Sequence, residues 1–90
     1  MHLKMTKQAL KAFEKLDAKQ YRQVVSAVIG LTTNPEPHDS QLLRGGIRGE
    51  RRIDVGEYRV IYAIDGELVE VLVVGKRNDD DVYKLWDRMK

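Results

Sequence analysis

The sequence predicts an α+β fold, in which an antiparallel β-meander packs against an N-terminal αα-hairpin and a short helix ends the chain. In the first part of the chain, apolar residues recur at helical spacing, and from residue 51 they switch to the two-residue period of strands. Helical spacing returns near the C-terminus. Helices layered on a sheet would bury these apolar faces, so the expected order is β-α-α-β-β-β-α.

The composition is that of one soluble globular domain, spanning residues 1–90. Hydrophobic residues make up 42% of the chain and charged residues 33%, which excludes a disordered protein. Cysteine is absent, so disulfides, thiol catalysis and cysteine-based zinc sites are excluded. No apolar run approaches the roughly 20 residues that span a bilayer, and the N-terminus lacks a signal-peptide core. A cytoplasmic location is therefore expected.

The N-terminal half is expected to contain a short strand, "HLKM", and two helices. Thr6 can cap the first helix and Asp17 the second. The apolar stripes that should face the core are Leu10, Phe13 and Leu16 in the first helix, and Tyr21, Val24, Val25, Val28 and Ile29 in the second. Because almost no loop separates the two helices, they are expected to form a hairpin.

The C-terminal half is expected to form the meander. A proline-containing loop, 32–40, and the glycine-rich segment "LLRGGIRG" lead into the first strand, "RRIDV". Gly56-Glu57 then turns the chain into a second strand over 58–64. Asp65-Gly66 predicts a type I′ hairpin turn before the last strand, over 67–75.

The run "NDDD" precedes the final helix and can cap it. The apolar stripe of that helix comprises Val82, Leu85, Trp86 and Met89. Acidic residues at a helix start stabilise its N-terminus, and no second acidic cluster completes a cation cage. We therefore expect no metal and no cofactor.

Arginine residues stand among the best strand formers of the meander. By alternation, Arg59 shares a face with Ile61 and Ala63. Both faces of this strand are largely apolar, so both should be covered, one by the helical hairpin and the other by the C-terminal helix. Arginine is costly to bury without a partner, and pairing with a carboxylate such as Asp54 or Glu57 is one interpretation.

The second interpretation is an anion site, in which Arg52, Arg59 and Arg77 gather at one end of the sheet. Arg77 continues the face of three valines, Val69, Val71 and Val73. Four further cations would widen the positive surface: Arg44, Arg48, Arg51 and Lys76. The planar guanidinium donates two hydrogen bonds to a phosphate, so a nucleic-acid backbone is the expected anion.

Four segments together resemble the RelE/ParE toxin superfamily of bacterial toxin–antitoxin pairs: "KQALKAFEKLD", "NPEPHDSQLLRGG", "RRIDVGEYRVIYAI" and "VVGKRNDDDVY". The similarity covers nearly the whole chain in the family's order. Its most specific parts are Gly56, Tyr58, Arg59 and Tyr62, and then Gly75, Lys76, Arg77, Val82 and Tyr83. The resemblance implies the RelE-like fold, which agrees with the order of elements expected above.

For a RelE-like member, the resemblance implies a ribosome-dependent endoribonuclease, or mRNA interferase, that cuts mRNA in the decoding site. The reaction needs no metal, because the 2′-OH attacks the adjacent phosphate. By position, Arg59 matches the phosphate-stabilising arginine and Arg77 the arginine that assists the leaving group. Tyr83 matches the C-terminal tyrosine, which stacks on a base or orients the 2′-OH. Arg52 stands where the best-known RelE proteins have a catalytic lysine.

The proton acceptor is where this sequence departs from the family. Glu50 replaces the family's preceding lysine, and an ionised glutamate among arginines could accept a proton. The alternative is a simple salt bridge from Glu50 to Arg52. His38 and Asp39 in the loop are further candidate acceptors.

The resemblance also implies partners: a RelB-like antitoxin that forms a hetero-oligomer with the toxin, the ribosome and mRNA. Two other functions remain open at this stage. A ParE-like toxin would poison DNA gyrase without RNA cleavage, and a non-toxic relic would bind RNA or protein without cleaving.

Overall fold

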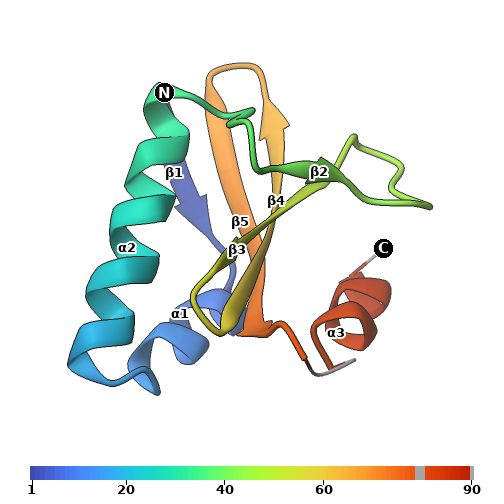
Figure 1. Ribbon diagram of the computed structural model, residues 1–90. Coiled ribbons are helices and arrows are strands. Elements are labelled where there is room, and N and C mark those ends of the chain that lie inside the picture. Colours follow the sequence, from blue (N-terminus) through green and yellow to red (C-terminus); the bar gives the residue numbers. More distant parts are fainter. Residues whose placement is uncertain (79–80, 90) are drawn as a thin grey trace.

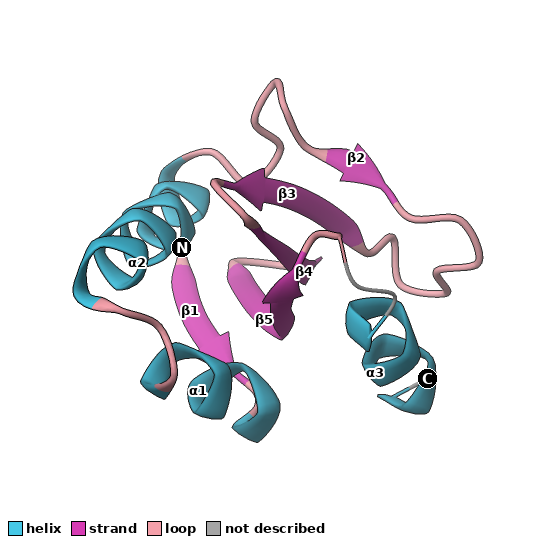
Figure 2. Cartoon of the chain, turned by 60° about the horizontal axis from the view of Figure 1, so that its bottom comes forward, coloured by secondary structure: helices cyan, strands magenta, loops and turns pink. Residues whose placement is uncertain are grey.

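The structure is a computed structural model that describes residues 1–78 and 81–89. Its elements are β1 (His2–Met5), α1 (Lys7–Glu14), α2 (Ala18–Thr33), β2 (Gln41–Leu42), β3 (Arg51–Val55), β4 (Tyr58–Asp65), β5 (Leu68–Lys76) and α3 (Asp81–Met89). Figures 1 and 2 show the sheet between two helical layers, with α1 and α2 on one face and α3 on the other. The predicted α+β class is confirmed, and so is the covering of both sheet faces.

The strands form one five-stranded sheet in the order β1-β5-β4-β3-β2. From β2 to β5, consecutive strands pair antiparallel, which is the predicted meander with one additional short strand. β1 pairs in parallel with the N-terminal half of β5, so the sheet is mixed. The sequence did not reveal β2, because two exposed residues are too few to show a strand period.

Both tight turns of the meander have a glycine followed by a glutamate. Gly56 has φ of 58° and Gly66 has φ of 59°, and no non-glycine residue in the described chain has positive φ. The predicted type I′ turn at Asp65-Gly66 is therefore wrong. Asp65 is the last residue of β4, and the turn is one residue further on, with positive φ only at its glycine, as in a type II′ turn.

Alternation along β4 sorts the core into two clusters, as predicted. Val60 and Tyr62 are fully buried against α1 and α2, whereas Ile61 and Ala63 are fully buried in the cluster that includes Val82 of α3. Arg59 stands at the same parity as Ile61 and Ala63. The side chain of Arg59 is therefore on the α3 face of the sheet.

A β-bulge in β5 corrects one expectation from the sequence. Ile61 pairs with Val73, but the next residue, Tyr62, pairs with Val71. Val71 consequently joins the cluster under α1 and α2, and Val73 joins the cluster under α3. The expectation that Val69, Val71 and Val73 share a face is wrong, because a bulge adds one residue without changing the apolar pattern. Past the bulge, Gly75 is back in register with Arg59.

The two predicted helix caps are confirmed: the Ala9 N–H donates to Thr6 Oγ1 at 3.2 Å, and the Gln20 N–H to Asp17 Oδ1 at 2.8 Å. The buried stripes are narrower than expected, comprising Ala9 and Phe13 in α1, and Val24, Val28 and Leu31 in α2. Three residues of the predicted stripes are about half exposed, namely Leu10, Tyr21 and Ile29. That part of the prediction is wrong because each helix is apolar over a wider arc than it packs against the sheet.

The C-terminal helix packs as its sequence predicts, with Val82 and Trp86 buried and Leu85 partly buried. The predicted acidic cap at 79–81 and the predicted burial of Met89 lie outside the described residues. None of the described helices is long and apolar enough to cross a membrane.

Candidate active site

The α3 face of the sheet carries a two-point ion pair between neighbouring strands. Arg59 of β4 stands opposite Asp54 of β3 in the register. Arg59 Nε donates to Asp54 Oδ1 at 2.7 Å, and Nη2 donates to Oδ2 at 3.1 Å. Of the two carboxylates considered from the sequence, the structure therefore selects Asp54 and not Glu57. The Arg59 side chain is only 15% exposed, so this pairing also satisfies a largely buried cation.

Tyr83 of α3 completes the surroundings of Arg59. Arg59 Nη1 donates a hydrogen bond to the Tyr83 hydroxyl. The guanidinium carbon also lies 5.6 Å from the centroid of the Tyr83 ring, within cation–π distance. The tyrosine and the arginine, which lie far apart in the sequence, thus form one unit that joins α3 to β4.

Two more arginines surround Asp54. Arg52 Nη1 lies 3.8 Å from Asp54 Oδ2, while Arg52 Nη2 donates to Gln41 Oε1 at 2.7 Å. The hydrogen bonds from Arg59, together with the charges of Arg59, Arg52 and Arg77, hold the pKa of Asp54 below its ordinary value, although burial acts in the opposite direction. The structure therefore brings Arg52, Arg59 and Arg77 together around one ionised carboxylate.

A cavity of about 380 Å³ adjoins this cluster. It is bordered on one side by the β2 segment and Arg44, and on the other by Tyr83 and Trp86 of α3, with Arg52 between them. Arg44 is exposed and Arg52 is partly exposed. A phosphate in this cavity would meet guanidinium groups from β3 and from the loop after β2, with an aromatic ring beside them.

Glu50 lies next to this cavity but is buried beneath α3. It is 3% exposed; its Oε1 accepts from the Arg48 N–H at 2.7 Å, and its Oε2 accepts from Trp86 Nε1 at 3.2 Å. Burial alone would raise the pKa of Glu50, but the hydrogen bonds from the backbone N–H groups of Arg48 and Glu50 and from Trp86 hold it below its ordinary value. Glu50 thus ties the glycine-rich loop to α3, in place of the considered salt bridge to Arg52.

The other cations named from the sequence do not join the cluster. Arg51 is on the opposite sheet face, where it donates to Ser40 Oγ at 3.1 and 2.9 Å and to Glu36 at 3.2 Å. Arg48 pairs with Glu70 at 3.0 Å, toward the other end of β5. Lys76 stands opposite Tyr58, on the side of α1.

The loop acceptors considered from the sequence also lie apart from Tyr83. His38 is exposed in the loop before β2. Asp39 borders a separate cavity of about 540 Å³ between α2 and the free edge of β3. Within the described residues, no group of three acidic or histidine side chains could hold a metal ion.

The sequence reading missed the central position of Asp54, which it treated only as one possible partner of Arg59. The signal was present in the Gly56-Glu57 turn. A two-residue turn there places Val55 opposite Tyr58, and hence Asp54 opposite Arg59. The contact between Arg52 and Gln41 had no such signal, because β2 could not be recognised.

The comparisons with known proteins agree with this geometry. Residues 3–81 match the family model described as "ParE toxin of type II toxin-antitoxin system, parDE". No curated protein sequence matches the chain. The RelE chain of the RelE–RelB complex from Pyrococcus horikoshii is 28% identical over 84% of this chain and 93% of its own, with a TM-score of 0.75.

Two other solved structures are similar. A double arginine-to-alanine mutant of Escherichia coli RelE in the free state is 26% identical, over 99% of this chain and 97% of its own, with a TM-score of 0.79. In the RelBE2 toxin–antitoxin complex of Mycobacterium tuberculosis, the matched chain is 28% identical, over 84% of this chain and 96% of its own, with a TM-score of 0.71. The chain therefore belongs to the ParE toxin family of type II toxin–antitoxin systems, within the RelE/ParE toxin superfamily.

Proposed function

We propose that this toxin is a RelE-like endoribonuclease that cuts mRNA in the decoding site of the ribosome and thereby inhibits translation. The observation that supports this proposal most strongly is the Arg59–Tyr83 unit beside Arg52 and Arg77 on one sheet face. Arginines that stay charged and an aromatic ring that can stack on a base are the groups that RNA cleavage requires.

In the proposed reaction the 2′-OH attacks the adjacent phosphorus while the bond from phosphorus to the 5′-oxygen breaks. The products are a 2′,3′-cyclic phosphate and a free 5′-OH. Arg59 and Arg52 stabilise the negative charge of the phosphorane, because pre-positioned cations favour a developing charge. Arg77 assists the leaving 5′-oxygen, and Tyr83 stacks on a base next to the cleaved bond.

The 2′-OH proton needs an acceptor, and Asp54 is the carboxylate that the arginine cluster itself contains. It is ionised, and it occupies two donor groups of Arg59. A substrate phosphate that took over these donors would release the Asp54 carboxylate and strengthen it as a base. Glu50, buried and bonded to Trp86, serves in this proposal as a support for α3 and the glycine-rich loop.

We also propose that a RelB-like antitoxin binds this toxin in a hetero-oligomer. The similar chains from Pyrococcus horikoshii and Mycobacterium tuberculosis were solved as toxin–antitoxin complexes. An acidic segment laid over the arginine face would neutralise it and exclude RNA.

Primer extension on a defined message in programmed ribosomes tests the nuclease. The purified toxin should produce new 3′ ends inside the decoding-site codon, and the Arg77→Ala variant should not. Intact message with a folded wild-type toxin would refute the proposal.

A second candidate function follows from the matching family model, whose printed description is a ParE toxin. A ParE-like toxin would inhibit DNA gyrase without cutting RNA. A supercoiling assay with purified gyrase distinguishes the two functions, because the nuclease proposal predicts no inhibition.

A further inference from the structure

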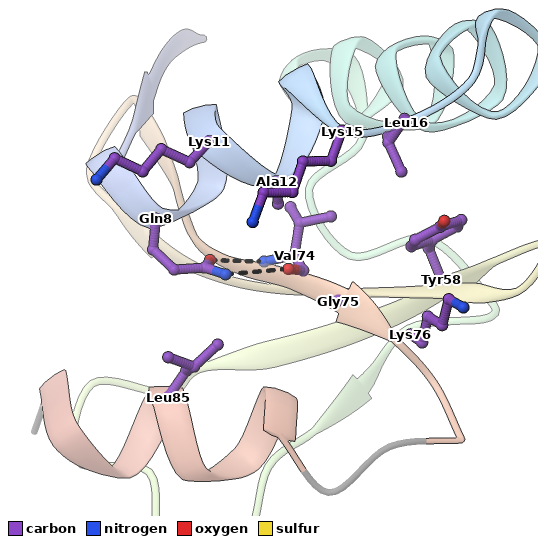
Figure 3. Close-up of a pocket in the computed structure, with 10 residues that line it drawn as sticks. All are labelled: Gln8, Lys11, Ala12, Lys15, Leu16, Tyr58, Val74, Gly75, Lys76 and Leu85. Atoms are coloured by element: carbon purple, nitrogen blue, oxygen red, sulfur yellow. Dashed lines mark hydrogen bonds between the residues drawn. The ribbon is translucent and has the colours of Figure 1, made fainter.

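A second cationic cavity lies between α1 and α3, alongside the C-terminal half of β5. Its volume is about 580 Å³. Figure 3 shows Lys11 and Lys15 of α1 above it, Leu85 of α3 below it, and Tyr58 and Lys76 at the end of the sheet. We call these three lysines with Tyr58 the lysine cavity.

The lysines of this cavity have no partner within the described part of the chain. Lys11, Lys15 and Lys76 are exposed, and no hydrogen bond or ion pair to another described residue involves their side chains. No residue that lines the cavity is acidic. By contrast, Arg48, Arg51, Arg52 and Arg59 each have a carboxylate partner. Three unpaired like charges around one hollow form a surface prepared for an anion.

The lysine cavity is continuous with the arginine site along the sheet. Tyr58 directly precedes Arg59, and Lys76 directly precedes Arg77, so each pair of neighbours points to opposite faces of the same sheet end. Tyr58 and Lys76 also stand opposite each other in the register of β4 and β5. A chain of phosphates that passes the arginines on the α3 face can therefore continue around this end to the lysines.

The edge of β5 in the cavity is closed to a peptide strand. β1 pairs with β5 only as far as Val71, and beyond it the Gln8 side chain takes over. Gln8 Nε2 donates to the Val74 carbonyl at 3.2 Å, and Gln8 Oε1 accepts from the Val74 N–H at 3.1 Å, as Figure 3 shows. An extended acidic peptide would need these backbone groups to pair with β5. A phosphodiester strand needs only the lysines and an aromatic face.

We propose that the lysine cavity is a binding site for RNA phosphates outside the cleaved bond. The choice of RNA as the polyanion rests on the proposed function. Each ammonium group contacts a phosphate as a point charge, and the half-buried ring of Tyr58 offers a face for a base. The strand is either message that leaves the arginine site or ribosomal RNA beside it, because both present the same backbone.

The test measures binding without cleavage, using Arg59→Ala as a common background. A fluorescent single-stranded RNA oligonucleotide is titrated with the toxin at several salt concentrations, and vacant ribosomes form a second arm followed by co-sedimentation. The variant is Lys11→Ala/Lys15→Ala. Its matched control is Lys7→Ala/Lys19→Ala, which removes the same charge from exposed positions of α1 and α2 outside the cavity.

In the arm that contains the true ligand, the cavity variant should lower the slope of log K against log salt by about 1.4, since each lost single-strand contact accounts for roughly 0.7. The control should leave the slope unchanged. An effect on the oligonucleotide identifies message, and an effect on ribosomes alone identifies ribosomal RNA. Equal slopes for cavity variant and control in both arms would overturn the proposal, including when antitoxin binding is the property lost.

Failure of the nuclease proposal would be recognised separately. Wild-type toxin that leaves ribosome-bound message intact, yet binds RNA through Lys11 and Lys15, would remove the proposed enzyme and keep the RNA site. Circular dichroism of each variant shows whether the fold is retained. Lys11→Arg should restore the salt slope if charge at that position is what binds.

Discussion

Asp54 holds Arg59 by two hydrogen bonds across the β3–β4 pair, and it thereby occupies the side of the guanidinium that a phosphate would use. The hydrogen bond from Asp54 is the largest cause that raises the pKa of Arg59, so both partners stay charged at every physiological pH. In the free toxin the carboxylate therefore takes the place of the substrate's anion. RNA must displace this internal competitor before the arginine can act.

The first prediction concerns this competition. Asp54→Asn removes the internal anion, so RNA binding should tighten, while cleavage should slow because the proposed proton acceptor is lost. KM and kcat measured on programmed ribosomes separate the two effects, and both should fall. Asp65→Asn, an exposed aspartate at the end of β4, is the control and should change neither. A rise in kcat would exclude Asp54 as the base.

The second prediction concerns Arg59 itself. Arg59→Ala should lower the cleavage rate by on the order of 10²–10³, as expected when one donor to a developing charge is lost. The fold should survive, since Asp54 is exposed enough to be solvated without its partner. Cleavage is followed by primer extension, and Arg22→Ala, on an exposed position of α2, is the matched control. Undiminished cleavage with Arg59→Ala would remove this residue from the mechanism.

The third prediction separates the ring of Tyr83 from its hydroxyl. Tyr83→Phe keeps the ring over Arg59 and should stay within about threefold of wild-type binding. Tyr83→Ala loses base stacking, which is typically about 1–3 kcal/mol, so substrate binding should weaken by roughly 5- to 150-fold. Binding of a non-cleavable RNA with a 2′-deoxy cut site measures both. Equal losses for the two variants would show that the hydroxyl, and not the ring, is what matters.

The fourth prediction concerns stability. Glu50→Gln replaces one of the two acceptor oxygens by a donor, which leaves either the Arg48 N–H or the Trp86 indole N–H without a partner. The free energy of unfolding in urea should fall by about 1–3 kcal/mol. Glu67→Gln, in the exposed β4–β5 turn, should have little effect. An unchanged unfolding midpoint for Glu50→Gln would show that the contact with α3 does not hold the fold.

The fifth prediction concerns pH. The folded protein lowers the pKa of Glu50 and of Asp54 from the ordinary values of 4.5 and 3.8. In this range the unfolded chain binds more protons than the folded one, so the stability from these carboxylates is present above the ordinary values and is lost as the pH falls through the lowered ones. Glu50→Gln/Asp54→Asn should therefore make stability less dependent on pH below about 4.5. Urea unfolding between pH 7 and pH 3 would contradict this if wild type and double variant lost stability in parallel.

Much of the fold could be predicted because its patterns are local. The alternation of β4 assigned Arg59 to a face, and the caps at Thr6 and Asp17 marked two helix starts. The parallel pairing of β1, the two-residue β2 and the bulge in β5 depend on contacts between distant segments, so no local pattern revealed them.

The same division applies to the candidate site. The arginines of the cluster and Tyr83 could be named from their spacing and from the family resemblance. What each residue touches could not, since the contact of Glu50 with Trp86 depends on how α3 docks on the sheet. The lysine cavity escaped notice for a similar reason, because Lys11 and Lys15 meet Lys76 only after α1 packs beside β5.

The central claim is that the arginine cluster cleaves RNA through its own 2′-OH, and the chemistry of the new 3′ end tests this most directly. Message cut by wild-type toxin on programmed ribosomes is treated with a kinase that removes 2′,3′-cyclic phosphates and then ligated to an adaptor. We predict ligation only after that treatment, and no cut message with Arg77→Ala. Ends that ligate without treatment, or intact message with inhibited gyrase, would contradict the claim.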